Sequence, residues 1–76
     1  MDVRPREWDL LKVLKELGGR ARAEELARRM GIRPTTLMSD IASLAGKGLV
    51  RVWEEVRRRA RLTEEGSRYA RLGLPE

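Results

Sequence analysis

Residues 23–48, "AEELARRMGIRPTTLMSDIASLAGKG", decide the fold that we expect of this chain. Apolar residues recur at helical spacing on both sides of the central "MGIRP". They are Ala23, Leu26, Ala27 and Met30 before it, and Leu37, Ile41 and Leu44 after it. Gly31 readily adopts the left-handed conformation that ends a helix, and Pro34 fits the first position of the next one. The stretch therefore predicts two short amphipathic helices joined by a tight turn, which is a helix-turn-helix.

The stretch before it, "RPREWDLLKVLKELGG", predicts a first helix that ends at the paired glycines Gly18 and Gly19. Its apolar stripe consists of Leu10, Leu11, Val13, Leu14 and Leu17. Trp8 is expected to pack on the flank of this helix. Arg20 and Ala21 then have room for a very short strand.

A β-hairpin is expected next, in residues 49–62, which include "RVWEEVRRRARL". Pairing Val52 with Val56 places the apolar side chains on one buried face, because strand side chains alternate. That face holds Val50, Val52, Val56, Ala60 and Leu62. The opposite face then holds Arg51, Trp53, Arg57, Arg59 and Arg61, while Arg58 falls on the inner parity.

A last helix should follow Thr63, which is a plausible N-cap. Tyr69 and Leu72 are expected to pack inward, and Gly73 and Pro75 to end the helix. Gly66 costs about 1 kcal/mol relative to alanine inside a helix, so close packing is the expected reason for it. The whole order predicts an α+β winged helix in a single domain, residues 1–76: a helix-turn-helix, a two-stranded β-wing and a C-terminal helix.

The composition excludes several kinds of catalytic and metal-binding chemistry. Cysteine and histidine are both absent, which removes thiolate chemistry and the commonest general base and metal ligand. We therefore expect no catalysis by this chain alone, no metal and no cofactor. No long apolar run or signal peptide is present, so a cytoplasmic location is expected. The absence of Asn and Gln fits a heat-adapted source.

The net charge of +5 suits an anionic partner, nucleic acid before a membrane surface. Five of the twelve residues in "RVWEEVRRRARL" are arginine. A row of guanidinium groups on a ribbon can grip successive phosphates, and Trp53, if exposed, can stack on a base. The alternatives remain open: the arginines can protect a sheet edge from aggregation, and Trp53 can pack against a helix.

The outward face of the third helix is the other candidate contact surface. It is expected to carry hydroxyl residues, with cations at its ends: Arg33, Thr35, Thr36, Ser39, Ser43 and Lys47. Hydroxyl groups bind phosphate, ribose or bases but read sequence weakly, and Asp40 adds a negative charge that phosphates would resist. This pattern argues against a strongly sequence-specific DNA reader.

The closing residues "LTEEGSRYARLGLPE" resemble the N-terminal region of the α subunit of archaeal and eukaryotic-type phenylalanyl-tRNA synthetase. "LLKVLKELGGRARAEELARRMGI" and "SLAGKGLVRV" are similar to the winged-helix module of the same region. The resemblance implies a non-catalytic, tRNA-binding module that is excised from a longer chain and has the remaining synthetase domains or the β subunit as partners. The family's wing is often acidic or mixed, so the role of Arg57–Arg61 stays a hypothesis.

Two other functions remain open. A free-standing archaeal DNA-binding regulator would share the fold and bind duplex DNA as a dimer. A winged helix that docks an acidic protein would use the same arginines. The sequence does not decide between tRNA and duplex DNA.

Overall fold

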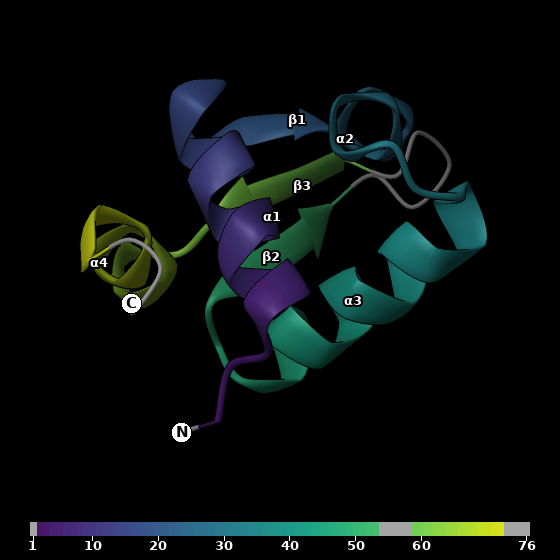
Figure 1. The fold of residues 1–76 in the computed structure, drawn as a ribbon. Coiled ribbons are helices and arrows are strands. Elements are labelled where there is room, and N and C mark those ends of the chain that lie inside the picture. The colour runs from purple at the N-terminus through teal and green to yellow at the C-terminus, as the bar shows by residue number, and fades with distance from the viewer. Residues whose placement is uncertain (1, 54–58, 73–76) are drawn as a thin grey trace.

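The computed structural model describes residues 2–53 and 59–72, which form four helices and a three-stranded antiparallel sheet (Figure 1). In chain order the elements are α1 (Pro5–Glu16), β1 (Arg20–Arg22), α2 (Ala23–Met30), α3 (Pro34–Gly46), β2 (Val50–Trp53), β3 (Arg59–Leu62) and α4 (Glu64–Leu72). The α+β winged-helix fold is thereby confirmed. Our expectations for Val56, Arg57, Arg58, Gly73 and Pro75 lie outside the described residues.

The ends of the helices follow the local sequence. Gly31 caps α2 in the left-handed conformation with φ 67°, and Gly18 and Gly19 have φ 90° and 93° after α1. Thr63 caps α4, because its Oγ1 accepts a hydrogen bond of 3.0 Å from the Gly66 N–H. The same hydroxyl donates to the carbonyl oxygen of Gly48 at 2.6 Å, which ties the start of α4 to the chain just before β2.

The strand order is β1-β3-β2, and the register differs from the predicted one. Val52 pairs with Ala60 and Val50 with Leu62, so the pairing of Val52 with Val56 is wrong. Residues 54–58 separate the last paired positions, Trp53 and Arg59, whereas the predicted pairing left three residues between the strands. Because the partner moves by an even number of residues, the alternation of faces predicted for the two strands still holds for the described side chains of residues 50–52 and 59–62.

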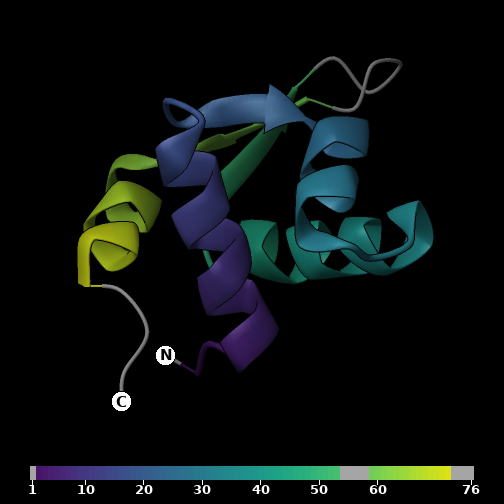
Figure 2. The same cartoon turned by 45° about the horizontal axis from the view of Figure 1, so that its top comes forward.

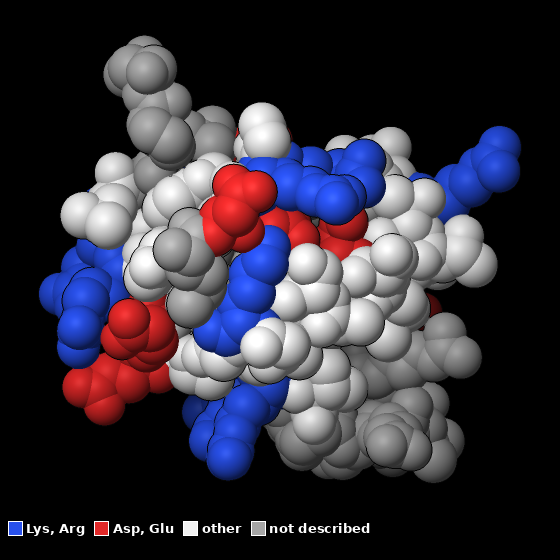
Figure 3. Space-filling model, turned by 90° about the horizontal axis from the view of Figure 1, so that it is seen from below, with Lys and Arg blue, Asp and Glu red and all other residues white. Residues whose placement is uncertain are grey.

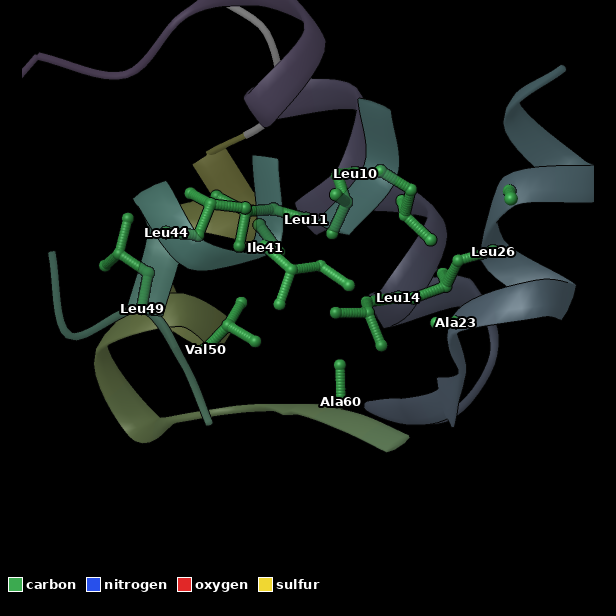
Figure 4. Close-up of a cluster of buried hydrophobic side chains, with 13 residues drawn as sticks. Leu10, Leu11, Leu14, Ala23, Leu26, Ile41, Leu44, Leu49, Val50 and Ala60 are labelled. Carbon is green, nitrogen blue, oxygen red and sulfur yellow. The ribbon is translucent and has the colours of Figure 1, made fainter. Parts of the chain in front are cut away.

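The core lies between the sheet and helices α1, α2 and α3 (Figure 4). Leu14 of α1, Leu26 of α2 and Ile41 of α3 meet above Val50 and Ala60 of the sheet, all nearly inaccessible to solvent. Burying a leucine or isoleucine side chain contributes about 1.5–3 kcal/mol. Packing rather than helix propensity therefore holds these short helices.

Two residues that were expected to be buried are exposed. Val52 is 38% exposed and lies on β2, an edge strand of the sheet. Leu72 is 73% exposed, because α4 turns its buried side, at Gly66 and Ala70, away from this position. Leu72 is also the last residue of the helix.

Helix α4 packs against α1 and approaches the chain before β2 closely. A Cβ atom added to Gly66 would lie 1.8 Å from the Leu49 carbonyl oxygen, so only glycine fits there and the expected reason for Gly66 is confirmed. The Tyr69 ring stacks on Trp8 of α1, with centroids 5.6 Å apart and planes inclined by 27°. Trp8 is thus the packing residue that its position on α1 predicted.

Candidate nucleic-acid interface

An identical tripeptide, Arg-Ala-Arg, forms both β1 (residues 20–22) and most of β3 (residues 59–61). The two copies pair antiparallel with Ala21 opposite Ala60. Ala60 is fully buried, so the alanines face the core and the flanking arginines face outward. The two copies therefore place Arg20 opposite Arg61 and Arg22 opposite Arg59.

Strand β2 extends this arrangement on the other side of β3. Arg51 lies opposite Arg61, and Trp53 lies opposite Arg59. Neighbouring strands are about 4.8 Å apart. We call the outer surface formed by Arg20, Arg22, Arg51, Arg59 and Arg61 the arginine face. Its members come from all three strands, and no described helix lies over it (Figure 2).

The arginine face is electrostatically unfavourable in the isolated chain. Like charges directly opposite each other on paired strands repel. Four members of the face are exposed and Arg59 is half-buried. In the described part of the chain, none of the four exposed members forms an ion pair. A polyanion laid on this face would relieve the repulsion.

A shallow groove of about 410 Å³ runs beside β1 toward α2. Its charged lining residues are Arg20, Arg22, Arg28 and Arg59, together with Glu24 and Glu25. Four cations face two carboxylates, so the groove keeps an excess of positive charge. It continues the arginine face onto the helix that follows β1.

The candidate residues of α3 lie on another side of the molecule, across the core from the sheet (Figure 2). Arg33, Thr35, Ser39 and Ser43 are exposed, and Thr36 is half-buried. Seen from this side, basic and acidic groups lie next to one another and uncharged atoms cover much of the remaining surface (Figure 3). The structure therefore does not bring the α3 residues together with the arginine face.

Lys47 at the end of α3 is bound to a carboxylate. Its Nζ lies 2.7 Å from Oε1 of Glu7, a residue of α1 that is only 1% exposed. The same carboxylate oxygen accepts the backbone N–H of Arg4 at 3.0 Å. Burial disfavours the charged form of Glu7, but hydrogen bonds from Lys47, Ser43 and Arg4 outweigh it and lower the pKa of Glu7 below its ordinary value. The charge of Lys47 is thus neutralised within the fold.

The position of Asp40 also differs from the predicted one. It does not stand on the outward face: its side chain is only 7% exposed and is turned toward α1. The Arg6 guanidinium binds it in a two-point contact, Nε to Oδ2 at 2.6 Å and Nη2 to Oδ1 at 3.1 Å. Asp40 sits beside the apolar stripe of α3, within reach of α1, and therefore would not repel phosphates.

The sequence reasoning missed Arg20, Arg22 and Glu7. The repeated Arg-Ala-Arg was a usable signal for the first two, because two strands with the same alternation can share a sheet. Glu7 stands three residues after Arg4, the position at which a glutamate caps the start of a helix. Its partner Lys47 lies 40 residues away, and no local pattern connects the two.

Residues 2–53 and 59–72 contain no group of three or more His, Cys, Asp or Glu placed to hold a metal ion. In the same residues, no helix is long and apolar enough to cross a membrane. The described surface offers cations and hydroxyl groups. Their chemistry is suited to holding a polyanion by hydrogen bonds and charge.

Residues 1–61 match the family model described as "MarR family". Among solved structures, a MarR family transcriptional regulator from Silicibacter pomeroyi superposes with a TM-score of 0.81 at 25% identity, over 91% of this chain and 50% of that one. A probable transcriptional regulator from Pseudomonas aeruginosa gives 0.83 at 21% identity, over 93% and 56%. These neighbours share the winged-helix fold.

Curated sequences give a different relationship. The phenylalanine–tRNA ligase alpha subunit of Thermococcus kodakarensis is 40% identical over 72 residues, which are 95% of this chain and 14% of that subunit. The corresponding subunit from Methanocorpusculum labreanum is 40% identical over 76 residues, 100% of this chain and 16% of that subunit. The chain therefore spans a small part of these relatives and is similar to their N-terminal winged-helix region.

Proposed function

The chain belongs to the MarR family, and we propose that it is a nucleic-acid-binding module with tRNA as its partner, a non-catalytic part of a phenylalanyl-tRNA synthetase alpha subunit. Nucleic-acid binding is supported mainly by the arginine face, because its exposed cations have no carboxylate partners in the described residues. The 40% identity to synthetase alpha subunits over nearly the whole chain supports tRNA over other nucleic acids.

The proposed contact is mainly electrostatic. Each guanidinium presents two donors in one plane and matches two phosphate oxygens, so Arg51 and Arg61 hold neighbouring phosphates. Contacts from Arg57 and Trp53, predicted from the sequence, remain part of this proposal, although Arg57 lies outside the described residues. Every phosphate that is neutralised releases counterions, which makes the affinity depend steeply on salt. The hydroxyl groups of α3 contribute at most secondary contacts, through Thr35, Thr36, Ser39 and Ser43, with Arg33 at the helix start.

The proposed assembly follows from the same relatives. As part of an alpha subunit, the module would be joined to further synthetase domains and work beside the beta subunit in the cytoplasm. No aminoacylation chemistry is assigned to these 76 residues. Their task would be to raise the affinity of the enzyme for tRNA.

Fluorescence anisotropy tests the proposal. Labelled tRNA and a random-sequence DNA duplex of the same charge are titrated with the chain at several salt concentrations. We expect tighter binding to tRNA, with the logarithm of the affinity falling linearly as the logarithm of salt rises. Equal, weak binding to both ligands would contradict the tRNA assignment.

A second candidate is a DNA-binding regulator, which the family match and the regulator structures favour. This function requires a dimer that binds two half-sites about one helical turn apart. Sedimentation measures the oligomeric state, and footprinting on duplexes with inverted repeats measures site protection. A monomer at micromolar concentration that protects no such duplex would remove this candidate.

A further inference from the structure

We infer that the nucleic acid lies across the whole outer face of the sheet, with β1 as a full part of the binding surface and α3 outside it. This rests on the proposed function and goes beyond it, because it assigns binding to Arg20, Arg22 and Arg28. It also moves the contact away from the helix that a helix-turn-helix inserts into the major groove.

The register of the sheet aligns the arginines of the three strands in rows. Arg20, Arg61 and Arg51 lie directly opposite one another across the three strands. A second row, two residues along, starts at Arg22 and continues through Arg59. The rows are about 6.8 Å apart along the strands and the members of a row about 4.8 Å apart across them. The cations thus cover a two-dimensional patch, of which β1 supplies one full edge.

The groove beside β1 carries the second step. Arg28 of α2 is exposed and lines this groove together with Arg20 and Arg22. The positive surface therefore continues past the edge of the sheet onto α2. Glu24 and Glu25 line the same groove, so they limit how deeply a phosphate backbone can enter there. The backbone would lie over the arginines rather than down in the groove.

Most of the positive charge near α3 is already held in ion pairs. Lys47 is bound to Glu7, and Arg6, which reaches α3 from α1, is bound to Asp40. Arg33 is left at the start of the helix, where no ion pair holds it within the described residues. The sequence also contains no Asn and no Gln, the side chains that read adenine with two hydrogen bonds. Within the described residues, helix α3 therefore offers phosphates one cation without an ion pair, Arg33 at its start, and it has no amide side chain for reading bases.

The partner that fits is the phosphate backbone of a double-stranded RNA stem, held by charge and shape without sequence readout. A-form RNA is recognised mostly in this way, because its deep major groove does not admit side chains. A tRNA supplies such stems. We expect affinity that depends strongly on salt and weakly on the base sequence of the stem.

The test compares three double variants of the chain in tRNA titrations. Arg20→Ala with Arg22→Ala removes two cations from β1. Lys12→Ala with Arg71→Ala removes two exposed cations from α1 and α4 and is the matched charge control. Thr35→Ala with Ser39→Ala removes exposed hydroxyls from α3. Thermal melts followed by circular dichroism verify that each variant is folded.

The β1 variant should bind about tenfold more weakly, and its salt slope should fall by about 1.4 to 1.8, since each lost phosphate contact removes about 0.7 to 0.9. The charge control and the α3 variant should change affinity less than twofold. Replacing both β1 arginines by lysine keeps the charge and should retain the salt slope.

The inference is overturned if the β1 variant behaves like the charge control, or if the α3 variant loses as much affinity as the β1 variant, while wild-type binding of tRNA still supports the proposed function. A wild-type chain that binds neither tRNA nor duplex in dilute buffer overturns both. An acidic protein would then be the remaining occupant of the arginine face.

Discussion

Helix α3 and the outer face of the sheet both carry basic residues, yet their charges are treated in opposite ways. Beside α3, two cations meet two buried carboxylates at 2.6 and 2.7 Å. On the sheet, the four exposed arginines have no such partner among the described residues. Net charge therefore does not locate a binding surface. What matters is which cations the fold has already neutralised.

The two treatments have different costs. The ion pairs beside α3 join this helix to α1, and losing one partner of such a buried pair leaves an uncompensated charge. The exposed arginines of the arginine face are screened by solvent, so the repulsion between them is small. No carboxylate among the described residues offsets it. The first arrangement serves stability and the second leaves a surface ready for a polyanion.

The largest effect on stability should come from adding a methyl group at Gly66. In Gly66→Ala the new methyl group collides with the Leu49 carbonyl oxygen, so α4 must move away from the start of β2. Overpacking of this kind costs about 3 kcal/mol or more here, against the roughly 1 kcal/mol that alanine adds by helix propensity. Urea unfolding measures the loss. The control is Gly46→Ala in α3, where nothing lies within 4 Å and a small gain is expected.

The next largest effect is expected from breaking the ion pair between Glu7 and Lys47. Glu7→Gln removes the charge that holds Lys47, and we expect a loss of about 1.5–3 kcal/mol, the range for hydrogen bonds to charged groups. The measurement is thermal unfolding at pH 7. Ser39→Ala on the exposed side of α3 is the control and should leave the melting temperature nearly unchanged.

The pH dependence of the same pair follows from its sign. The folded-state pKa of Glu7 is lowered, so its stabilisation is present above the ordinary glutamate pKa of about 4.5 and is lost as pH falls through the lower folded value. The stability gap between wild type and Glu7→Gln should therefore close on acidification. A gap that stays constant from pH 7 to pH 3 would show that the charge of Glu7 does not stabilise the fold.

A smaller effect is expected from removing two exposed arginines of the sheet. Arg51→Ala with Arg61→Ala removes a directly opposed pair of cations. Binding of tRNA should weaken about tenfold, which is about 1.4 kcal/mol. Stability of the free chain should rise by a few tenths of a kcal/mol, because like charges opposite each other cost about 0.2–1 kcal/mol. Anisotropy and urea unfolding on the same samples measure the opposed signs.

The smallest effect is the salt dependence of stability without any ligand. Raising the ionic strength to 0.15 M shortens the screening length to about 8 Å and weakens the repulsion on the arginine face. The melting temperature of wild type should rise by about a degree, and that of the Arg51→Ala, Arg61→Ala variant by less. A fall in both would show that the exposed arginines are paired rather than repelling.

Much of this molecule could be predicted from local patterns. Leucines at helical spacing, glycines at helix ends and the alternation around Ala60 predicted the helix-turn-helix and the faces of residues 50–52 and 59–62. The faces survived an incorrect register because the error was an even number of residues. Even the reason for Gly66 followed from its cost inside a helix.

Local patterns were enough to predict the winged helix and the outward direction of Arg51 and Arg61, because both depend on residues close together in the chain. Which charges remain available for a partner depends on contacts between distant parts of the chain. Glu7 and Lys47 lie 40 residues apart, and Arg6 and Asp40 lie 34 apart. Likewise, Arg20 faces Arg61 only because β1 and β3 pair. Charge pairing acts through space, and only the folded chain fixes those distances.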